Sequence, residues 1–216
     1  FRIVWNPSTV FALGPGNTPY QIQGNFNANL RIEYTYLADA EIQYMTKQRT
    51  QLIEQVQLNQ FFIPHGVQTA QCALNFYNPV KELFFILQND SALGYDYSNT
   101  ATSTSTSIGT GDLLAQLELD FNTTERISQN VGSPQFLRII QPLEFHTRIP
   151  DRIFYMYSFS LDPENDQPSG SVNLSRIKNQ NLFLTLNQTP ANVDVRVYAV
   201  SYNFIEGGKT VFSNFF

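Results

Sequence analysis

The sequence predicts an all-β protein, an antiparallel eight-stranded sandwich of the jelly-roll type. Apolar and polar residues alternate over several stretches, which is the period of a half-buried strand. The clearest stretches are residues 113–121, 153–161 and 193–199, and turn-rich segments such as 13–19 (LGPGNTP) lie between the alternating stretches. The number and length of the strands favour a jelly roll over an immunoglobulin domain.

Further elements follow from the same pattern. Strands are expected at residues 1–5, 10–13, 28–37, 51–58, 69–77, 82–88, 136–141 and 181–187. One short helix is expected at residues 39–48, because Asp39 can cap its first turn. The β-branched Thr50 and the apolar pattern of residues 53–56 then return the chain to strand.

The segment 98–110 (SNTATSTSTSIGT) is of low complexity and has no periodic apolar residue. It cannot bury enough apolar surface to offset its ordering entropy. We therefore expect an exposed loop at one end of the sandwich, with residues 89–111 as the most mobile part of the domain.

Composition limits the size and the partners of the domain. A chain of 216 residues with 42% hydrophobic content is typical of one well-buried domain, so residues 1–216 are expected to form a single jelly roll. Charged residues make up only 14%, and 20 Asn and 18 Gln outnumber the 13 basic and 18 acidic residues together. The net charge of −5 and the scattered basic residues argue against direct binding of nucleic acid.

The cysteine count and the length of the apolar runs bear on the cellular compartment and on membrane insertion. Cys72 is the only cysteine, so the chain can form no internal disulfide. The longest apolar runs, such as Leu83–Leu87, are far shorter than the roughly 20 residues that cross a bilayer. Neither feature indicates an oxidising compartment or a transmembrane helix.

The candidate chemical groups do not form a recognisable site. His65 and His146 lack the spacing of metal ligands. Residues Asp162–Asp166 (DPEND) resemble the alternating oxygens of a calcium loop but lack its glycine and distal Glu, so an exposed acidic turn is expected. Glu118 and Asp120 share a strand face and could mimic a glycosidase pair, although a solvated face is the simpler interpretation. We expect no catalytic, cofactor-binding or metal site, and therefore no enzyme.

Four Asn-X-Ser/Thr sequons are present, at Asn89, Asn122, Asn173 and Asn187. A composition rich in Asn, Ser and Thr accounts for most of them. We expect the Asn173 side chain to hold a turn, and Asn89, beside the expected loop, is the most plausible glycan carrier among the four.

The most informative segment is Pro168–Ile177 (PSGSVNLSRI), which lies between two apolar runs. Pro168 and Gly170 supply turn chemistry, and Asn173 and Ser175 offer side chains that can bond back to a nearby backbone group. The segment resembles the PSG…N-[FL]-S-R-I signature near the C-terminus of the major capsid proteins of large eukaryotic, nucleocytoplasmic DNA viruses.

Further segments resemble that family in the same order along the chain. They are Tyr34–Leu37 followed by Ala40 and Glu41, Leu52–Gln57 (LIEQVQ), Asn75–Leu83 (NFYNPVKEL), Phe121–Arg126 (FNTTER) and Ala199–Gly208 (AVSYNFIEGG). Three positions depart from the family pattern. Gln43 stands at a usually charged position, Asn78 replaces a His before Pro79, and Glu206 interrupts an apolar ending.

The resemblance implies a structural capsid protein with no cofactor. The chain would be the second half of a double jelly roll, without its first jelly roll and without the strand expected before Phe1–Trp5. Such proteins form homotrimers, pseudo-hexameric capsomers that tile an icosahedral shell. The implied partners are neighbouring capsomers and minor capsid proteins, with no direct contact to nucleic acid and an indirect contact with an internal membrane. The implied location is the virion, after assembly in the host cytoplasm.

Two other functions remain open from the residues alone. A carbohydrate-binding jelly-roll module is the alternative, with Trp5 and the 11 tyrosines as stacking platforms for sugars. A jelly-roll glycosidase is more distant, because the sequence offers no convincing carboxylate pair.

Overall fold

The computed structural model describes residues 29, 31–33, 36, 38–45, 49–89, 112–150, 153–187, 192–207 and 213–215. The chain divides into two compact units, the larger with residues 52–92, 96–203 and 216, and the smaller with residues 1–51, 93–95 and 204–215. Trp5, the strands expected at 1–5 and 10–13 and the loop expected at 98–110 lie outside the described residues.

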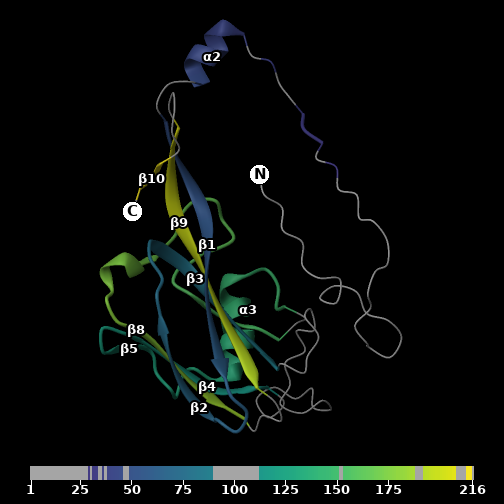
Figure 1. Ribbon diagram of the computed structural model, residues 1–216, viewed down its shortest axis with the longest axis vertical. Coiled ribbons are helices and arrows are strands. Elements are labelled where there is room, and N and C mark those ends of the chain that lie inside the picture. The colour runs from purple at the N-terminus through teal and green to yellow at the C-terminus, as the bar shows by residue number, and fades with distance from the viewer. Residues whose placement is uncertain are drawn as a thin grey trace. The chain divides into compact units, whose positions relative to one another are not determined.

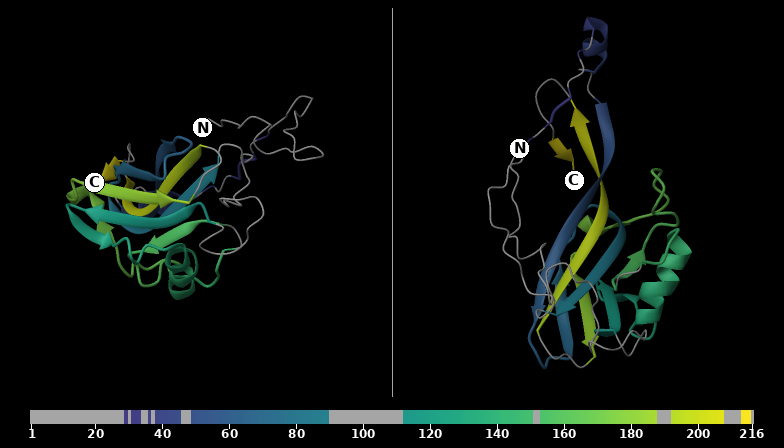
Figure 2. Two further views of the ribbon diagram at one scale, coloured as in Figure 1. Left: turned by 90° about the horizontal axis from the view of Figure 1, so that it is seen from below. Right: turned by 90° about the vertical axis from the view of Figure 1, so that its right-hand side faces the viewer.

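Two antiparallel sheets make up the larger unit (Figures 1 and 2). One sheet has the order β1 (Arg49–Ile63), β9 (Val193–Gly207), β3 (Pro79–Asn89) and β6 (Tyr155–Ser158), with the short β7 (Val172–Asn173) also paired to β3. The other has the order β2 (Thr69–Leu74), β8 (Gln180–Leu186), β4 (Leu114–Phe121) and β5 (Thr124–Ile127). Each sheet therefore mixes strands from the beginning and the end of the chain.

The strand pairs are nested around the tight turn at Asn122 and Thr123. The pair β4 and β5 flanks that turn, and the pairs β3 with β6, β2 with β8 and β1 with β9 follow outward. A ribbon of this kind folded over on itself is a jelly roll, which confirms the predicted fold class. The described strands of these two sheets, apart from β10, lie between Arg49 and Gly207. That the domain lacks its opening strand stays a prediction.

The core lies between the sheets and follows the predicted alternation. In β8, every second residue from Gln180 to Leu186 is buried. The inward side chains of the two sheets meet in one cluster that includes Leu83, Phe85, Leu87, Leu117, Leu119, Leu182, Leu184, Val195 and Val197. Each such side chain stabilises the fold by about 1.5–3 kcal/mol on burial.

The prediction of a strand at residues 136–141 is wrong. Phe136–Ile140 form a π-helical turn (η2), followed by a short helix α3 (Gln141–Phe145), which packs against β6. Leu137 is fully buried whereas Ile140 is 49% exposed, which is burial on one side of a helix. Pro142 lies in the first turn of α3, directly after the π-helical turn, and the first turn is where helices accept Pro most readily. Tertiary packing thus overrides the β-propensity of two adjacent isoleucines.

The smaller unit contains helix α2 (Asp39–Met45), close to the predicted helix, and β10 (Ser213–Phe215), which pairs with the end of β9. The predicted cap differs, because Glu41 Oε2 accepts a hydrogen bond from the Ala38 N–H at 2.9 Å. This is the reciprocal half of a capping box. The described residues of the strand expected at 28–37 are not in a strand.

Across the described ranges, none of the helices has the length and apolar character needed to cross a membrane.

Candidate functional site

Two signature segments far apart in the sequence are joined directly. The backbone N–H of Asn78 donates to Ser175 Oγ at 2.8 Å, and the N–H of Leu174 donates to the Asn78 carbonyl at 3.1 Å. In addition, Pro79 pairs with Asn173 in the β3–β7 ladder. Ser175 was expected to bond to a nearby backbone group, but its partner lies 97 positions earlier in the chain.

The Asn residues at this junction have local roles. Asn173 Oδ1 accepts from the Ser175 N–H at 3.1 Å, so its predicted role in holding a turn is confirmed. Asn78 has φ of 68°, a left-handed conformation in which Asn is one of the few favoured residues other than Gly. Its departure from the family pattern is therefore compatible with this turn. Gln43 and Glu206, the other departures, lie in α2 and β9 with side chains outside the described set.

A buried amide reinforces the junction. Gln180 Nε2 donates to the carbonyls of Phe76 at 2.8 Å and of Leu174 and Ile177 at 3.2 Å each. Its Oε1 accepts from the Phe76 N–H at 3.2 Å. One side chain therefore satisfies several buried backbone groups in two signature segments.

The first and last signature segments of the jelly roll are linked in the same way. Gln57 Oε1 accepts from the Tyr77 N–H at 3.1 Å, and Gln57 Nε2 donates to Ser201 Oγ at 2.9 Å. Ser201 Oγ in turn donates to the Gln55 carbonyl at 3.1 Å, and Asn203 Nδ2 donates to Gln55 Oε1 at 2.9 Å. The segments that resemble the family thus form hydrogen bonds that stabilise the fold, and these bonds do not create a catalytic centre.

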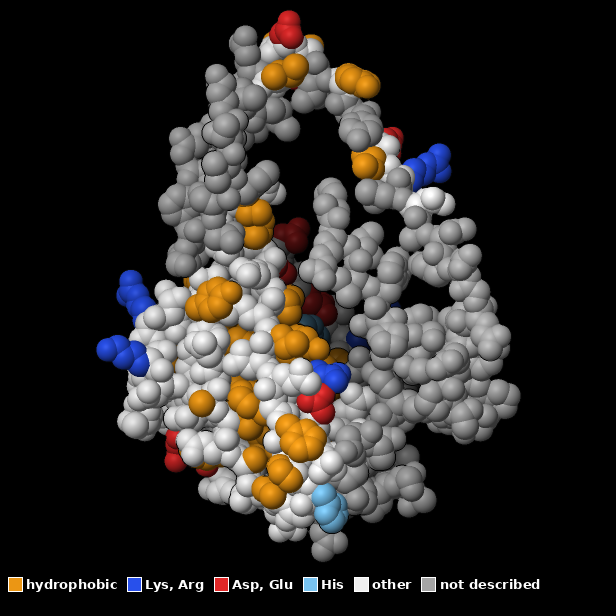
Figure 3. All heavy atoms as spheres, viewed as in Figure 1, with side chains coloured by type: hydrophobic (Ala, Val, Ile, Leu, Met, Phe, Trp, Pro, Cys, Tyr) orange, Lys and Arg blue, Asp and Glu red, His pale blue; other side chains and the backbone are white. Residues whose placement is uncertain are grey.

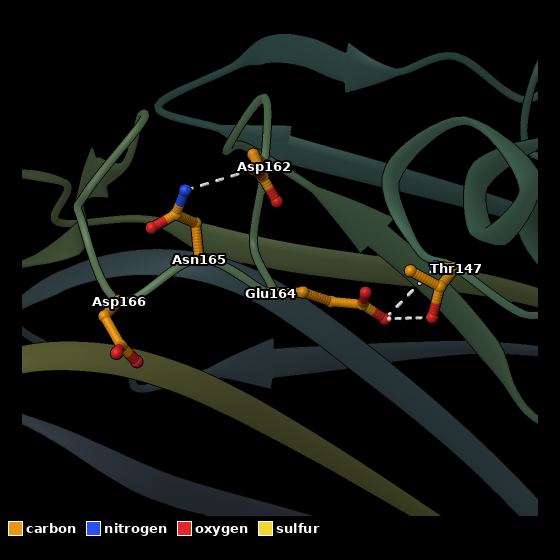
Figure 4. A pocket seen from close by; sticks show the side chains of 5 residues that line it. All are labelled: Thr147, Asp162, Glu164, Asn165 and Asp166. Carbon is orange, nitrogen blue, oxygen red and sulfur yellow. Dashed lines mark hydrogen bonds between the residues drawn. The ribbon is translucent and has the colours of Figure 1, made fainter.

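The titratable and polar side chains gather instead around the loop 159–171. A shallow pocket of about 460 Å³ is lined by Thr147, Asp162, Glu164, Asn165 and Asp166 (Figure 4). Glu164 Oε1 accepts from both the N–H and the Oγ1 of Thr147, at 3.2 and 3.3 Å. Because ligand pockets are mostly apolar, this open acidic pocket does not have the character of a small-molecule site.

His146 lies between two carboxylates next to this pocket. Its Nδ1 is 3.1 Å from Glu164 Oε1, and its Nε2 is 3.1 Å from Glu82 Oε2 on β3. Burial raises the pKa of Glu82, and the nearby charges of His146 and Lys81 oppose that rise. The backbone N–H of Thr147 lowers the pKa of Glu164.

Lys81 forms a second link from the sheet to the same loop. Its Nζ donates to the Pro163 carbonyl at 2.8 Å and pairs with Glu54 on β1. The Lys81 side chain is 5% exposed and that of Glu54 48%. Lys81 thus bridges an edge strand and the acidic loop.

His65 lies elsewhere, in the exposed turn after β1, where its backbone N–H donates to Asn192 Oδ1 at 2.8 Å. The structure therefore gives the two histidines different partners. Within the described ranges, His, Cys, Asp and Glu side chains do not gather in threes suited to hold a metal ion. The partners of His146 are 18 and 64 positions away in sequence, which is why no spacing rule could indicate them.

Glu118 and Asp120 project from the same side of β4, and Asp120 lies opposite Glu125 on β5. Desolvation raises the pKa of Glu118, with a further contribution from the charges of Asp120 and Glu125. Because both carboxylates come from one strand and one side, they do not flank a substrate as glycosidase carboxylates do. This is a crowded acidic strand face.

The four sequons differ in how their Asn side chains are used. Asn187 Nδ2, the glycan attachment atom, donates to the Asp112 carbonyl at 2.6 Å. Asn122 Oδ1 accepts from the Asn179 N–H at 3.1 Å, and the Asn122 residue is exposed. Asn89 is half-buried at the end of β3. That Asn89 is the most plausible glycan carrier among the four stays a prediction.

The comparisons with known proteins agree with this description. A sequence model of the family described as "Large eukaryotic DNA virus major capsid protein" matches residues 41–208. "Probable capsid protein 4" of Acanthamoeba polyphaga mimivirus is 32% identical over 83% of this chain and 36% of its own length. The "Major capsid protein" of Pyramimonas orientalis virus is 30% identical over 83% of this chain and 46% of its own. The chain thus spans less than half the length of these curated relatives.

Solved structures support the fold. The VP54 protein of PBCV-1, from a crystal structure fitted into a reconstruction of the virophage Sputnik, aligns with a TM-score of 0.68 and 21% identity. The alignment covers 84% of this chain and 55% of that chain. The family match, the curated relatives and the jelly-roll topology agree, and the chain belongs to the major capsid protein family of large eukaryotic DNA viruses, a family of structural proteins and not of enzymes.

Proposed function

We propose that this chain is the C-terminal jelly roll of a capsid protein whose homotrimers form pseudo-hexameric capsomers of an icosahedral viral shell. Family membership over residues 41–208 is the observation that carries the proposal. In this role, its partners are neighbouring capsomers and minor capsid proteins, and its location is the virion after assembly in the host cytoplasm. An acidic net charge of −5 is consistent with a protein that does not bind nucleic acid directly.

The buried centre of a subunit interface is commonly apolar, and β1 supplies a candidate for such a centre. Four residues at even-numbered positions of this edge strand, Leu52, Val56, Leu58 and Phe62, are 36–63% exposed. Residues at alternate positions of a strand share one face, so these side chains form an apolar stripe, which Glu54 and Gln60 interrupt at the same face. Figure 3 shows hydrophobic side chains gathered over β1 and β9 on the outer face of their sheet. Exposed apolar surface of this kind marks interaction sites in soluble proteins.

The polar side chains around this stripe suit close packing of many copies. Gln60, also on the outer face of β1, donates to Asp194 on β9 at 2.8 Å. Because Asn and Gln outnumber charged residues, like copies repel one another weakly. Amide side chains can also pair across wet interfaces without the desolvation cost of buried ions.

The stripe can be tested with the double substitution Val56→Asp and Phe62→Asp in the full-length polypeptide. Two carboxylates in an apolar contact should weaken trimer association about tenfold or more, since buried unpaired charges are costly. Analytical ultracentrifugation measures the association, and circular dichroism checks that the sheets remain. The matched control is Thr69→Asp with Gln71→Asp, two exposed positions on the edge strand β2 of the other sheet. An equal loss in both variants would exclude the stripe as the specific contact.

Salt dependence provides a second test of the interface. Apolar and amide contacts should keep the trimer fraction constant as the Debye length falls from about 10 Å at 0.1 M salt to about 3 Å at 1 M. Ultracentrifugation of the full-length polypeptide across that range gives the fraction. Steep dissociation with rising salt would mean that ionic pairs hold the trimer. A monomer that binds a glycan column would instead favour the carbohydrate-binding alternative.

A further inference from the structure

His146 lies between two carboxylates, and two protons are needed for its ring nitrogens to hydrogen-bond both of them. Glu164 Oε1 already accepts from the N–H and the hydroxyl of Thr147, so it serves as an acceptor, and His146 Nδ1 must donate to it. The opposite ring nitrogen, Nε2, faces Glu82 Oε2 at 3.1 Å. A hydrogen bond there needs a second proton, held either by the imidazolium or by the carboxyl of Glu82.

We propose that Glu82, His146 and Glu164 form a protonation-dependent latch, in which the imidazole of His146 connects Glu164, in the acidic loop of residues 162–166, to Glu82 on the sheet. With the shared proton in place, the ring bridges β3 and the loop through two hydrogen bonds. Once that proton is lost, the lone pair of Nε2 faces the carboxylate of Glu82, whose side chain is only 7% exposed. Burial increases this repulsion because water cannot screen it well. The latch is therefore closed at mildly acidic pH and opens as the pH rises.

The charged groups around the His146 ring also favour the protonated, closed latch. From β3, Glu82 faces the ring. The charge of Lys81 acts on Glu82, and Lys81 is itself paired with Glu54 of β1. From the loop, Glu164 contacts the ring, with Asp162 and Asp166 lining the same pocket. Glu144 and Arg148 flank His146 along the chain as exposed residues. Acidic groups dominate this set, which favours retention of the shared proton.

Only the contact between the His146 ring and Glu82 depends on the shared proton. The base of the loop is held by neutral contacts, because Ser169 Oγ accepts from the Asp162 N–H at 2.8 Å and the Phe159 N–H donates to the Lys81 carbonyl at 2.8 Å. These bonds do not titrate near neutral pH. Lys81 Nζ also donates to the Pro163 carbonyl, and Thr147 donates twice to Glu164. Deprotonation should therefore release the His146 ring from Glu82 and change the surroundings of Glu164, without freeing the loop or unfolding the sandwich.

The Thr147 amide reports the latch directly, since it donates to Glu164. Its ¹H–¹⁵N NMR signal in the 216-residue chain should shift in one transition as the pH rises from about 5 to about 9. In Glu82→Gln, the amide N–H of the new side chain can donate to the neutral Nε2, so the closed signal should persist to higher pH. In His146→Gln, the signal should be in the open position throughout.

His65→Gln is the matched control, because it removes the other histidine and should leave the Thr147 transition unchanged. Protonation of Glu164 itself does not interfere with this transition, because the pKa of Glu164 is lowered from the usual value of a Glu. A Thr147 signal that does not move over this range would mean that His146 is a fixed bridge, and the proposal would be overturned. An unchanged midpoint in Glu82→Gln would also overturn it, because the shared proton would then not involve Glu82.

Discussion

Replacing Gln180 by Glu is expected to destabilise the domain by about 3–5 kcal/mol at pH 7. The substitution keeps the shape of the side chain but replaces the Nε2 donor by an oxygen. That oxygen would face the carbonyls of Phe76, Leu174 and Ile177, which then lose their shared donor inside the protein. Urea denaturation followed by circular dichroism gives the free energy of unfolding.

The destabilisation should depend on pH in a defined direction. Burial among carbonyl oxygens raises the folded-state pKa of the introduced carboxyl above its unfolded value of about 4.3. The folded variant therefore binds the proton more tightly, so its stability relative to the wild type is greatest below about pH 4 and falls as the pH rises. Gln71→Glu, at an exposed position of the adjacent strand β2, is the control and should change stability little. If both variants lose the same stability, the carbonyl contacts of Gln180 are not the cause.

Gly132→Ala is expected to cost about 3 kcal/mol or more, because the added methyl group has no room. A β-carbon at this position would lie 1.7 Å from the carbonyl oxygen of Leu117 in β4. The same glycine accepts a hydrogen bond from the Leu117 N–H at 2.8 Å, so relieving the clash would break a backbone contact to the sheet. Thermal and urea unfolding of the variant measure the loss.

Gly66→Ala is the matched control for this prediction. Gly66 has φ of 82° and nothing within 4 Å of the added β-carbon. Its substitution should therefore cost only the strain of a left-handed residue, about 1–2 kcal/mol. If Gly66→Ala is as destabilising as Gly132→Ala, backbone conformation and not the contact with β4 determines the effect.

The strands are the part of the fold that local pattern determines. In β8 and β9 one side of the strand faces the core and the other faces away, and the alternation of Leu182, Leu184 and Leu186 records this directly. The turn at Asn173 is equally local, since its side chain caps a backbone group two residues later. Such features depend on neighbours within a few positions, so the sequence is sufficient to predict them.

Pairing across the molecule was decided by the tertiary structure alone. The segment 136–141 has the composition of a strand, yet it is helical because Leu137 fills a place in the core and the chain packs against β6. Ser175 was assigned a local partner, but folding brings Asn78 to it. A sequence pattern reports whether one segment is buried or exposed. The helix at 136–141 and the partner of Ser175 depend instead on which distant segment packs against each of them.

The two histidines show that sequence patterns are equally unable to predict the partners of a site residue. Nothing in the residues around His65 and His146 separates them, and both lack the spacing of a metal site. The jelly-roll winding leaves His65 in an exposed turn and places His146 between Glu82 and Glu164. The sequence alone determined the all-β fold class, the strongly alternating strands β4, β8 and β9, and the resemblance to a capsid family. The charged cluster at the loop needed the fold, because its hydrogen bonds join groups that only long-range packing brings within 3.1 Å of each other.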